Sequence, residues 1–311
     1  MSGVLTGFVV VASVVAVGYL LGRTGALGPG AQAVVSRLVF FVGTPALLVR
    51  TLAGTDPREL LSGQVVLTGA GVAVCAVLWW VLARRRLHLG VREAVIGALS
   101  SCYVNAVNIG LPVAAYVLGD LTAVLPALLL QMVVLSPVAL AVLDVTGERA
   151  RPPGRAARAR RLVAPLLNPV LLAGAAGLAL SVTGASLPTA LDRPLELLGG
   201  LAVPGALLAF GMSLHGRVSS SWRRTDVLLA TALKAFVQPA VTYAAARWGL
   251  GVGPAGTYAA TVVAALPTAQ NVFTFAVRYG AGVELARDTV LLTTVLCVPV
   301  VLLISVLLPH G

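Results

Sequence analysis

Two asparagines, Asn105 and Asn108, lie near the middle of an apolar run, and Gly110 and Pro112 follow them closely. Pro112 removes a backbone donor and clashes with the preceding turn, so a helix should break or kink there. Hydrocarbon offers no partners to the freed backbone groups, and such a break is tolerated only where it faces protein or a water-filled cavity. We therefore predict a substrate-binding cavity, in which the carboxamides contact a carboxylate or cap the broken helix.

A second apolar run carries a matching disruption, because Pro267, Thr268, Gln270 and Asn271 follow one another near its middle. Gln270 lies 162 residues after Asn108. Two broken helices related by a two-fold axis would cross at their breaks, where their half-helix N-termini would direct partial positive charge at one point. We predict that this point binds an anion, that Thr268, Gln270 and Asn271 contact it, and that the prolines shape it.

Lys234 is the only ionisable side chain well inside any apolar run. One interpretation is that its ammonium snorkels to the basic end of the helix, beyond Arg223 and Arg224. Reaching that far would take about two helical turns, which is long for one side chain. The other interpretation is a buried role, as a counter-charge to an anionic substrate or as a clamp on backbone carbonyls.

The composition is that of a polytopic membrane protein, because 58% of the residues are hydrophobic and 11% are charged. A soluble domain carries about 25% charged residues. The net charge of +11 follows from basic residues in loops on one side of the membrane, so the expected partner is the lipid bilayer and not nucleic acid. Cys75, Cys102 and Cys297 lie in apolar runs without metal-ligand spacing, and we expect neither a metal nor a cofactor.

The apolar runs have the length that a helix needs to cross a bilayer. They predict ten spans, at residues 4–22, 34–52, 63–83, 94–118, 122–143, 165–183, 195–214, 226–248, 255–277 and 289–308. Most loop arginines fall in the odd-numbered loops, while the even loops hold only Arg50, Arg58, Arg193 and Arg247. This bias predicts that the odd loops are cytoplasmic and that both termini lie outside.

The two halves of the chain share landmarks at nearly constant separation. Pro45 and Pro204 lie 159 residues apart, and Pro137 and Pro299 lie 162 apart. Five spans per half require the second half to enter from the opposite side, which predicts two inverted five-helix repeats with broken spans four and nine crossing at mid-membrane. The repeats would be residues 1–143 and 165–311, joined by a basic cytoplasmic linker at 144–164, and Pro45 and Pro204 would be structural hinges.

The positions of the acidic residues bear on energy coupling. All Asp and Glu residues lie in loops or at span ends, as do His88, His215 and His310. Proton relays usually use intramembrane carboxylates or histidines. We therefore predict a potential-driven uniporter and not an enzyme, since the sequence also lacks a P-loop, an HExxH motif and a nucleophile–base set at depth. Sodium coupling through carbonyls, Asn and Thr stays open.

The sequence resembles the auxin efflux carrier family, which includes bacterial malate and malonate permeases. The similar stretches are VFFVGTPALL at 39–48, NAVNIGLP at 105–112, Asn168-Pro169, Pro204 through GMSL at 211–214, Lys234 with Pro239, and LPT at 266–268 through Tyr279-Gly280. The resemblance implies the ten-helix inverted-repeat fold, transport of a small organic anion, and a substrate site at Asn105, Asn108, Pro112, Pro267 and their neighbours. It favours an exporter in a bacterial plasma membrane.

Three alternatives remain at this point. The same scaffold could be a sodium- or proton-coupled carboxylate symporter, a channel, or a receptor that binds without transport.

Arg278 stands before Tyr279-Gly280, where bacterial relatives often carry an acidic residue. The first span carries Gly18 and Gly22 in small-xxx-small spacing, which would also permit a homodimer.

Overall fold

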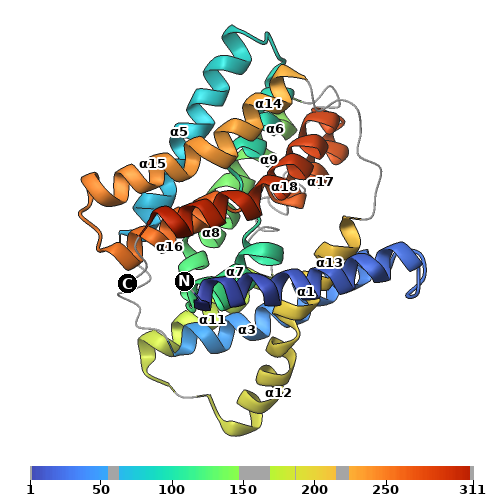
Figure 1. Ribbon diagram of the computed structural model, residues 1–311, viewed down its shortest axis with the longest axis vertical. Coiled ribbons are helices and arrows are strands. Elements are labelled where there is room, and N and C mark those ends of the chain that lie inside the picture. The colour runs from blue at the N-terminus through green and yellow to red at the C-terminus, as the bar shows by residue number, and fades with distance from the viewer. Residues whose placement is uncertain (1, 55–62, 147–168, 186, 215–223, 309–311) are drawn as a thin grey trace. The chain divides into compact units, whose positions relative to one another are not determined.

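The computed structural model describes residues 2–54, 63–146, 169–185, 187–214 and 224–308, and all regular elements in these ranges are helices (Figure 1). The predicted all-α class is therefore confirmed. Residues 147–164 of the predicted linker lie outside the described ranges.

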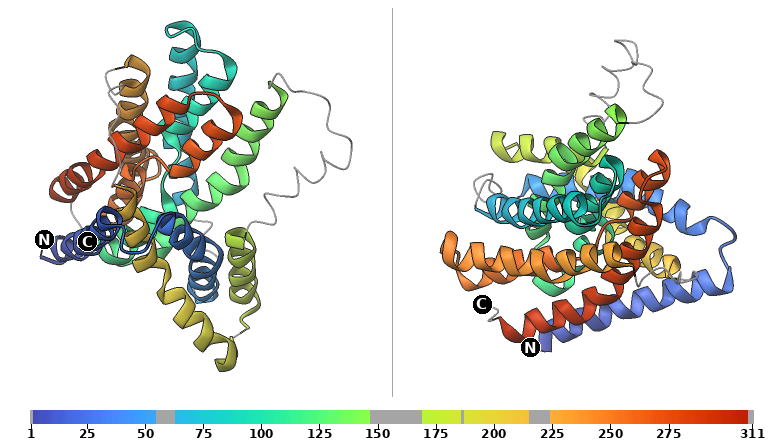
Figure 2. Two further views of the ribbon diagram at one scale, coloured as in Figure 1. Left: turned by 90° about the vertical axis from the view of Figure 1, so that its right-hand side faces the viewer. Right: turned by 90° about the horizontal axis from the view of Figure 1, so that it is seen from above.

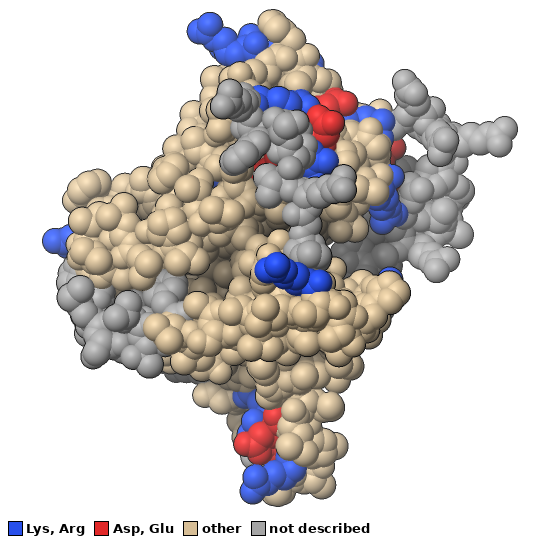
Figure 3. Space-filling view, turned by 45° about the vertical axis from the view of Figure 1, so that its right-hand side comes forward, with Lys and Arg blue, Asp and Glu red and all other residues tan. Residues whose placement is uncertain are grey.

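Six helical stretches of the described residues are long and apolar enough to cross a membrane. They are Ala31–Ala53, Gln64–Arg85, Leu121–Val145, Thr189–Ser213, Thr225–Gly249 and Val283–Leu307. Two of the other predicted spans, 94–118 and 255–277, are each interrupted and form shorter helices. On the face in Figure 3, charged side chains gather in a few clusters with broad uncharged surface beside them, as the hydropathy pattern indicates.

The chain forms two compact units, and each draws segments from both halves of the sequence. Unit 1 comprises the described residues of Met1–Ser62, Ala106–Leu125 and Leu166–Arg217, and unit 2 those of Gly63–Asn105, Pro126–Pro165 and Val218–Gly311. Each unit is a group of segments that pack together, and it therefore differs from the predicted repeats, which are continuous in sequence.

The described part of unit 1 consists of α-helices, three π-helices and one 3₁₀-helix. Its elements are α1 (Ser2–Thr24), α2 (Ala31–Leu38), the π-helix η1 (Val39–Gly43), α3 (Thr44–Ala53), the π-helix η2 (Ala106–Gly110), α7 (Leu111–Val113), the π-helix η3 (Ala114–Leu118), the 3₁₀-helix η4 (Leu121–Val124), α11 (Pro169–Thr183), α12 (Thr189–Gly200) and α13 (Ala202–Ser213).

Glycines let the helices of unit 1 approach with their backbones almost in contact. A Cβ on Gly18 of α1 would lie 2.9 Å from Leu208 Cα of α13, and a Cβ on Gly211 would lie 2.8 Å from Tyr19 N. A Cβ on Gly177 of α11 would lie 2.8 Å from the Cβ of Leu52 in α3. Small residues permit this close packing, which is typical of helix pairs in membranes.

Unit 2 contains most of the buried polar side chains among the described residues. Its elements are α5 (Gln64–Arg85), α6 (Val91–Cys102), most of α8 (Leu125–Leu130), the π-helix η5 (Gln131–Leu135), α9 (Ser136–Val145), α14 (Thr225–Ala232), the π-helix η7 (Leu233–Val237), α15 (Gln238–Ala244), the π-helix η8 (Ala245–Gly249), α16 (Pro254–Ala265), α17 (Gln270–Tyr279) and α18 (Val283–Leu307).

The core of unit 2 is organised around Trp79 of α5, which is fully buried. Its indole N–H donates to the Ala94 carbonyl at 2.9 Å, and its ring fills the space that a Cβ on Gly97 would need. α18 packs against α14, α16, α17 and α6 within the same unit (Figure 2). This packing brings α6, α16 and α17, which border the two interruptions, into contact with a continuous helix.

Candidate functional site

The two helix breaks lie side by side in unit 2. α6 ends at Cys102 and α16 ends at Ala265, and the extended residues that follow form an antiparallel bridge between Val104 and Thr268. The Asn105 N–H donates to the Pro267 carbonyl at 2.8 Å, and the Ala269 N–H donates to the Tyr103 carbonyl at 3.1 Å. We call residues 103–105 and 266–269 the crossover.

Side chains from two other helices accept hydrogen bonds from the remaining amides of the bridge. The Val104 N–H donates to Gln131 Oε1, and the Thr268 N–H donates to Thr293 Oγ1 at 3.1 Å. Every amide of the bridge is therefore satisfied, as buried backbone groups require. Gln131 and Thr293 are not among the residues predicted from the sequence, although both are polar residues in apolar runs and they lie 162 residues apart.

The broken end of α6 is held by side chains as well. The Thr268 hydroxyl donates to the Ser100 carbonyl at 2.6 Å, and Gln238 Nε2 donates to the Cys102 carbonyl at 3.2 Å. The last carbonyls of a helix have no partners within the helix and need such donors when they are buried. Thr268, which the sequence predicted as a contact for substrate, thus has a structural bond in the crossover.

Lys234 is fully buried, and its ammonium donates to the Ala264 carbonyl at 2.7 Å in the last turn of α16. This position excludes the interpretation in which the ammonium snorkels to the surface. A cation at a helix C-terminus is electrostatically favourable. Lys234 lies in the π-helix η7, as Gln131 lies in η5, and π-helical turns often occur at functional sites.

The predicted carboxamides in unit 2 gather at the start of α17. Asn105 is buried, Gln270 is half-buried and Asn271 is exposed. α17 begins at Gln270, and the preceding Ala269 provides no side-chain cap. The first amides of a helix carry partial positive charge, so this N-terminus can bind an anion beside the carboxamides.

The position of the first break corrects one prediction. The helix is interrupted at residues 103–105 and resumes at Ala106, whereas Pro112 lies within the helical run η2–α7–η3. The π-helical turns on both sides of α7 change the hydrogen-bond spacing, so the missing donor of Pro112 is accommodated without a break. Asn108 is half-buried in η2, Gly110 and Pro112 are buried, and all three belong to unit 1.

The predicted hinge prolines lie at helix junctions in unit 1. Pro45 is at the start of α3, directly after η1, and Pro204 is in the first turn of α13, directly after α12 ends. A Cβ on Gly43 would lie 3.1 Å from Ala202 Cα, so the two junctions pack against each other. Hinge motion at these prolines stays a prediction.

Two carboxylates are less peripheral than their sequence positions indicate. Asp226 and Asp288 lie near the ends of their helices, as expected, but both side chains are buried in unit 2. The described residues contain no group of three or more His, Cys, Asp or Glu that could hold a metal ion. The site therefore consists of carboxamides, a helix N-terminus, a buried ammonium and hydroxyls.

Comparison with known proteins identifies the family of the chain. A family model described as membrane transport protein matches residues 4–305. A protein of Rhizobium meliloti (strain 1021), described as "Putative malonate transporter", is 28% identical over 289 residues, which cover 91% of this chain and 89% of the relative. The chain is an integral membrane protein of the membrane transport family, the group of auxin efflux carrier-like proteins that its motifs resemble.

Proposed function

We propose that this protein is a secondary transporter for a small organic anion such as a carboxylate, which it moves chemically unchanged. The observation that carries the proposal is the crossover, where the Asn105 amide is bonded to the Pro267 carbonyl and α17 begins three residues later with Gln270 and Asn271. The relative described as a malonate transporter makes malonate the first compound to test.

In this proposal the anion binds where hydrogen-bond donors converge. Carboxamide N–H groups and the first amides of α17 would bind the carboxylate oxygens. Lys234 would contribute a fixed positive charge from behind the crossover, because its ammonium is held on the Ala264 carbonyl. Asn108, Gly110 and Pro112 are three to seven residues further along the chain from Asn105, and their predicted contact with the anion is tested at Asn108.

Transport would proceed by alternating access, with one inverted five-helix repeat rocking against the other around a crossover at mid-membrane. The proposed topology has ten spans, with the odd loops in the cytoplasm and both termini outside, in a bacterial plasma membrane. Its support is the arginine bias of the loops and the matching of the two breaks. A homodimer is part of the same proposal, but not through Gly18, which packs against Leu208 of α13 within unit 1.

The proposed driving force is the membrane potential. An inside-negative potential favours export of an anion by roughly 2.3 kcal/mol per charge per 100 mV. A dicarboxylate such as malonate would therefore be driven out strongly even against a concentration gradient. The proposed direction is export for this reason.

The test is uptake into inside-out vesicles of labelled malonate, other mono- and dicarboxylates and indole acids, with and without an imposed potential. Native protein is compared with Asn108→Ala and Lys234→Ala. Arg37→Ala is the matched control, because Arg37 is another cation inside a predicted span and its side chain is exposed.

We expect saturable accumulation of at least one acid that follows the potential and is lost in Lys234→Ala but not in Arg37→Ala. A current that does not saturate at low millimolar substrate would instead indicate a channel, and binding without uptake would indicate a receptor. Wild-type rates in both Asn108→Ala and Lys234→Ala would contradict the site, even if transport itself is present.

A further inference from the structure

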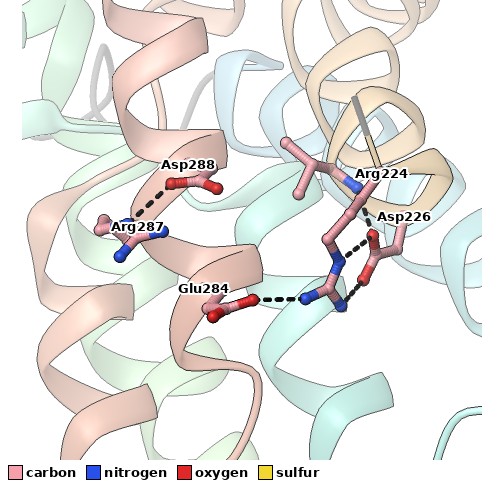
Figure 4. Close-up of polar contacts among 6 residues, drawn as sticks. Arg224, Asp226, Glu284, Arg287 and Asp288 are labelled. Atoms are coloured by element: carbon pink, nitrogen blue, oxygen red, sulfur yellow. Dashed lines mark hydrogen bonds and ion pairs between the residues drawn. The ribbon is translucent and has the colours of Figure 1, made fainter. Parts of the chain in front are cut away.

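Asp288 is a buried carboxylate with one oxygen that lacks a partner. It lies in the second turn of α18 and is 2% exposed. Arg287 Nε donates to Asp288 Oδ1 at 2.7 Å, whereas Oδ2 is buried without a hydrogen-bond partner among the residues that the structure describes (Figure 4). A buried, unpaired charged oxygen is costly, so a ligand is expected at Oδ2.

The charges around Asp288 are mostly matched with one another. Arg224 donates to Asp226 and to Glu284, each at 2.7 Å, and so joins the start of α14 to the start of α18 (Figure 4). The hydrogen bond to Asp226 raises the pKa of Arg224 above its ordinary value, although burial opposes this, and the guanidinium stays charged. Arg224, Asp226, Glu284, Arg287 and Asp288 form what we call the charge cluster, which has three carboxylates and two guanidinium groups.

The other helices packed against α18 contribute few further charges. Their charged or titratable groups are Arg92, Glu93 and Cys102 on α6, Arg278 and Tyr279 on α17, Tyr258 on α16 and Lys234 on η7. Arg92 donates a hydrogen bond to the Tyr279 carbonyl, and Lys234 donates one to the Ala264 carbonyl. Within the described part of the chain, the charge cluster thus has one carboxylate more than its guanidinium groups balance.

α18 connects Asp288 to the crossover. Thr293 lies five residues later, about 7.5 Å along a helix. Its hydroxyl donates to the Thr289 carbonyl at 2.7 Å and accepts the Thr268 N–H of the crossover at 3.1 Å. The hydroxyls of Thr289, and of Thr231 on the adjoining α14, are buried without a hydrogen-bond partner among the described residues. A change of charge at Asp288 therefore acts on the short segment of α18 that also carries Thr293, whose hydroxyl accepts the Thr268 N–H of the bridge.

We propose that Asp288 binds a proton on Oδ2 and that this proton crosses the membrane together with the anion. The proposal rests on the proposed function and refines its ion coupling. The proton comes from water on one side and returns to water on the other, and it offsets part of the negative charge that the anion brings into unit 2. A dianion with one proton keeps a net negative charge, so the membrane potential still drives it.

A metal cation fits this position less well than a proton does. Arg287 already places a positive charge on the same carboxylate, and a hard cation needs several oxygen ligands. A proton needs one acceptor oxygen, and Asp288 Oδ2 provides it. Malonate uptake with and without sodium, at equal pH on both sides, distinguishes the two cations.

The experiment uses the full chain in proteoliposomes, with the membrane potential held at zero by potassium and valinomycin. Labelled malonate uptake is measured with the lumen one pH unit more alkaline than the medium, and exchange of malonate across the membrane is measured without any gradient. Asp288→Asn is compared with Glu284→Gln, the matched control one turn earlier in the same cluster. A pH-sensitive dye in the lumen reports proton entry.

For native protein and Glu284→Gln, we expect the pH gradient to accumulate malonate up to about tenfold, which is the equilibrium ratio for one proton per anion and one pH unit. We expect Asp288→Asn to lose this accumulation while its exchange rate stays within about twofold of native, because exchange needs no net movement of protons. The exchange assay also shows that the variant is folded.

Three outcomes would overturn the proton assignment. These are pH-driven accumulation by Asp288→Asn, native transport with no proton entry, and accumulation that requires sodium instead of a pH gradient. If Asp288→Asn does not fold, native transport of malonate without proton entry still overturns the proposal. If native protein neither accumulates nor exchanges any acid of the panel, the proposed function itself fails, which is a different result from exchange without coupling.

Discussion

Units 1 and 2 hold their helices together by different means. In unit 1 the contacts are between backbones, as where Gly18 and Gly211 leave α1 and α13 no room for a side chain. In unit 2 the contacts at the crossover are hydrogen bonds from buried polar side chains, among them Gln131, Thr268 and Thr293. Among the described residues, every buried polar or charged side chain except that of Thr44 lies in unit 2.

This difference indicates where the function is concentrated. Buried polar groups in a membrane protein are costly and usually mark ligand or ion pathways. Glycine contacts have no such cost and fix the distance between two helices through van der Waals packing. We infer that unit 1 is mainly a packing framework and that unit 2 contains most of the groups that bind ligand.

The largest effect on stability is expected from filling a backbone contact of unit 1. Gly211→Leu would force α1 and α13 apart, because a Cβ there already meets Tyr19 N at 2.8 Å. Overpacking of this kind costs about 1–3 kcal/mol or more. Thermal unfolding in detergent should show a large fall in the midpoint. Gly200→Ala in the same unit is the control, since nothing lies within 4 Å of its Cβ position, and an equal loss there would contradict the packing argument.

A large effect on transport, with a smaller one on stability, is expected from Lys234→Met in unit 2. The change keeps most of the apolar stem, removes the charge, and leaves the Ala264 carbonyl without its ammonium donor. We expect anion uptake to fall at least tenfold, about 1.4 kcal/mol in binding terms. Uptake and unfolding are measured on the same preparation, and unaltered uptake would remove Lys234 from the site.

An intermediate effect is expected from Thr293→Val and from Gln131→Leu. Each removes the acceptor for one bridge amide, and a buried amide without a partner costs about 1–3 kcal/mol. Both variants should lower the unfolding midpoint and slow uptake several-fold. Thr183→Val is the control, because its exposed hydroxyl bonds only to its own helix in unit 1. Equal stability of all three variants would show that the bridge does not depend on these acceptors.

The smallest effect is expected from Arg50→Gln, which breaks a polar contact of unit 1. Arg50 donates to Asp192 at 2.6 Å, but the two side chains are 33% and 34% exposed. A partly exposed ion pair is worth about 0–1 kcal/mol. We expect an unfolding midpoint close to that of native protein and unchanged uptake. A loss as large as that of Thr293→Val would mean that unit 1 also depends on polar contacts.

Much of the fold follows from the sequence because hydropathy and backbone chemistry are local. The apolar runs predict helices of membrane-spanning length, and Pro267 marks the second break correctly. For Lys234 the sequence leaves a snorkelling and a buried position open, and the structure shows the buried one. The family follows from motifs spread along the whole chain.

Details of the site depend on contacts between distant segments, which local patterns do not specify. The first break lies at residues 103–105 and not at Pro112, because π-helical turns accommodate the proline while the bridge to Thr268 stabilises the extended residues. Gln131 and Thr293 acquire their roles only when their helices pack beside the bridge. Likewise, the sequence places Asp288 near the end of a span, but the packing of α18 against its neighbours decides that the carboxylate is buried and that one oxygen remains without a donor among the described residues.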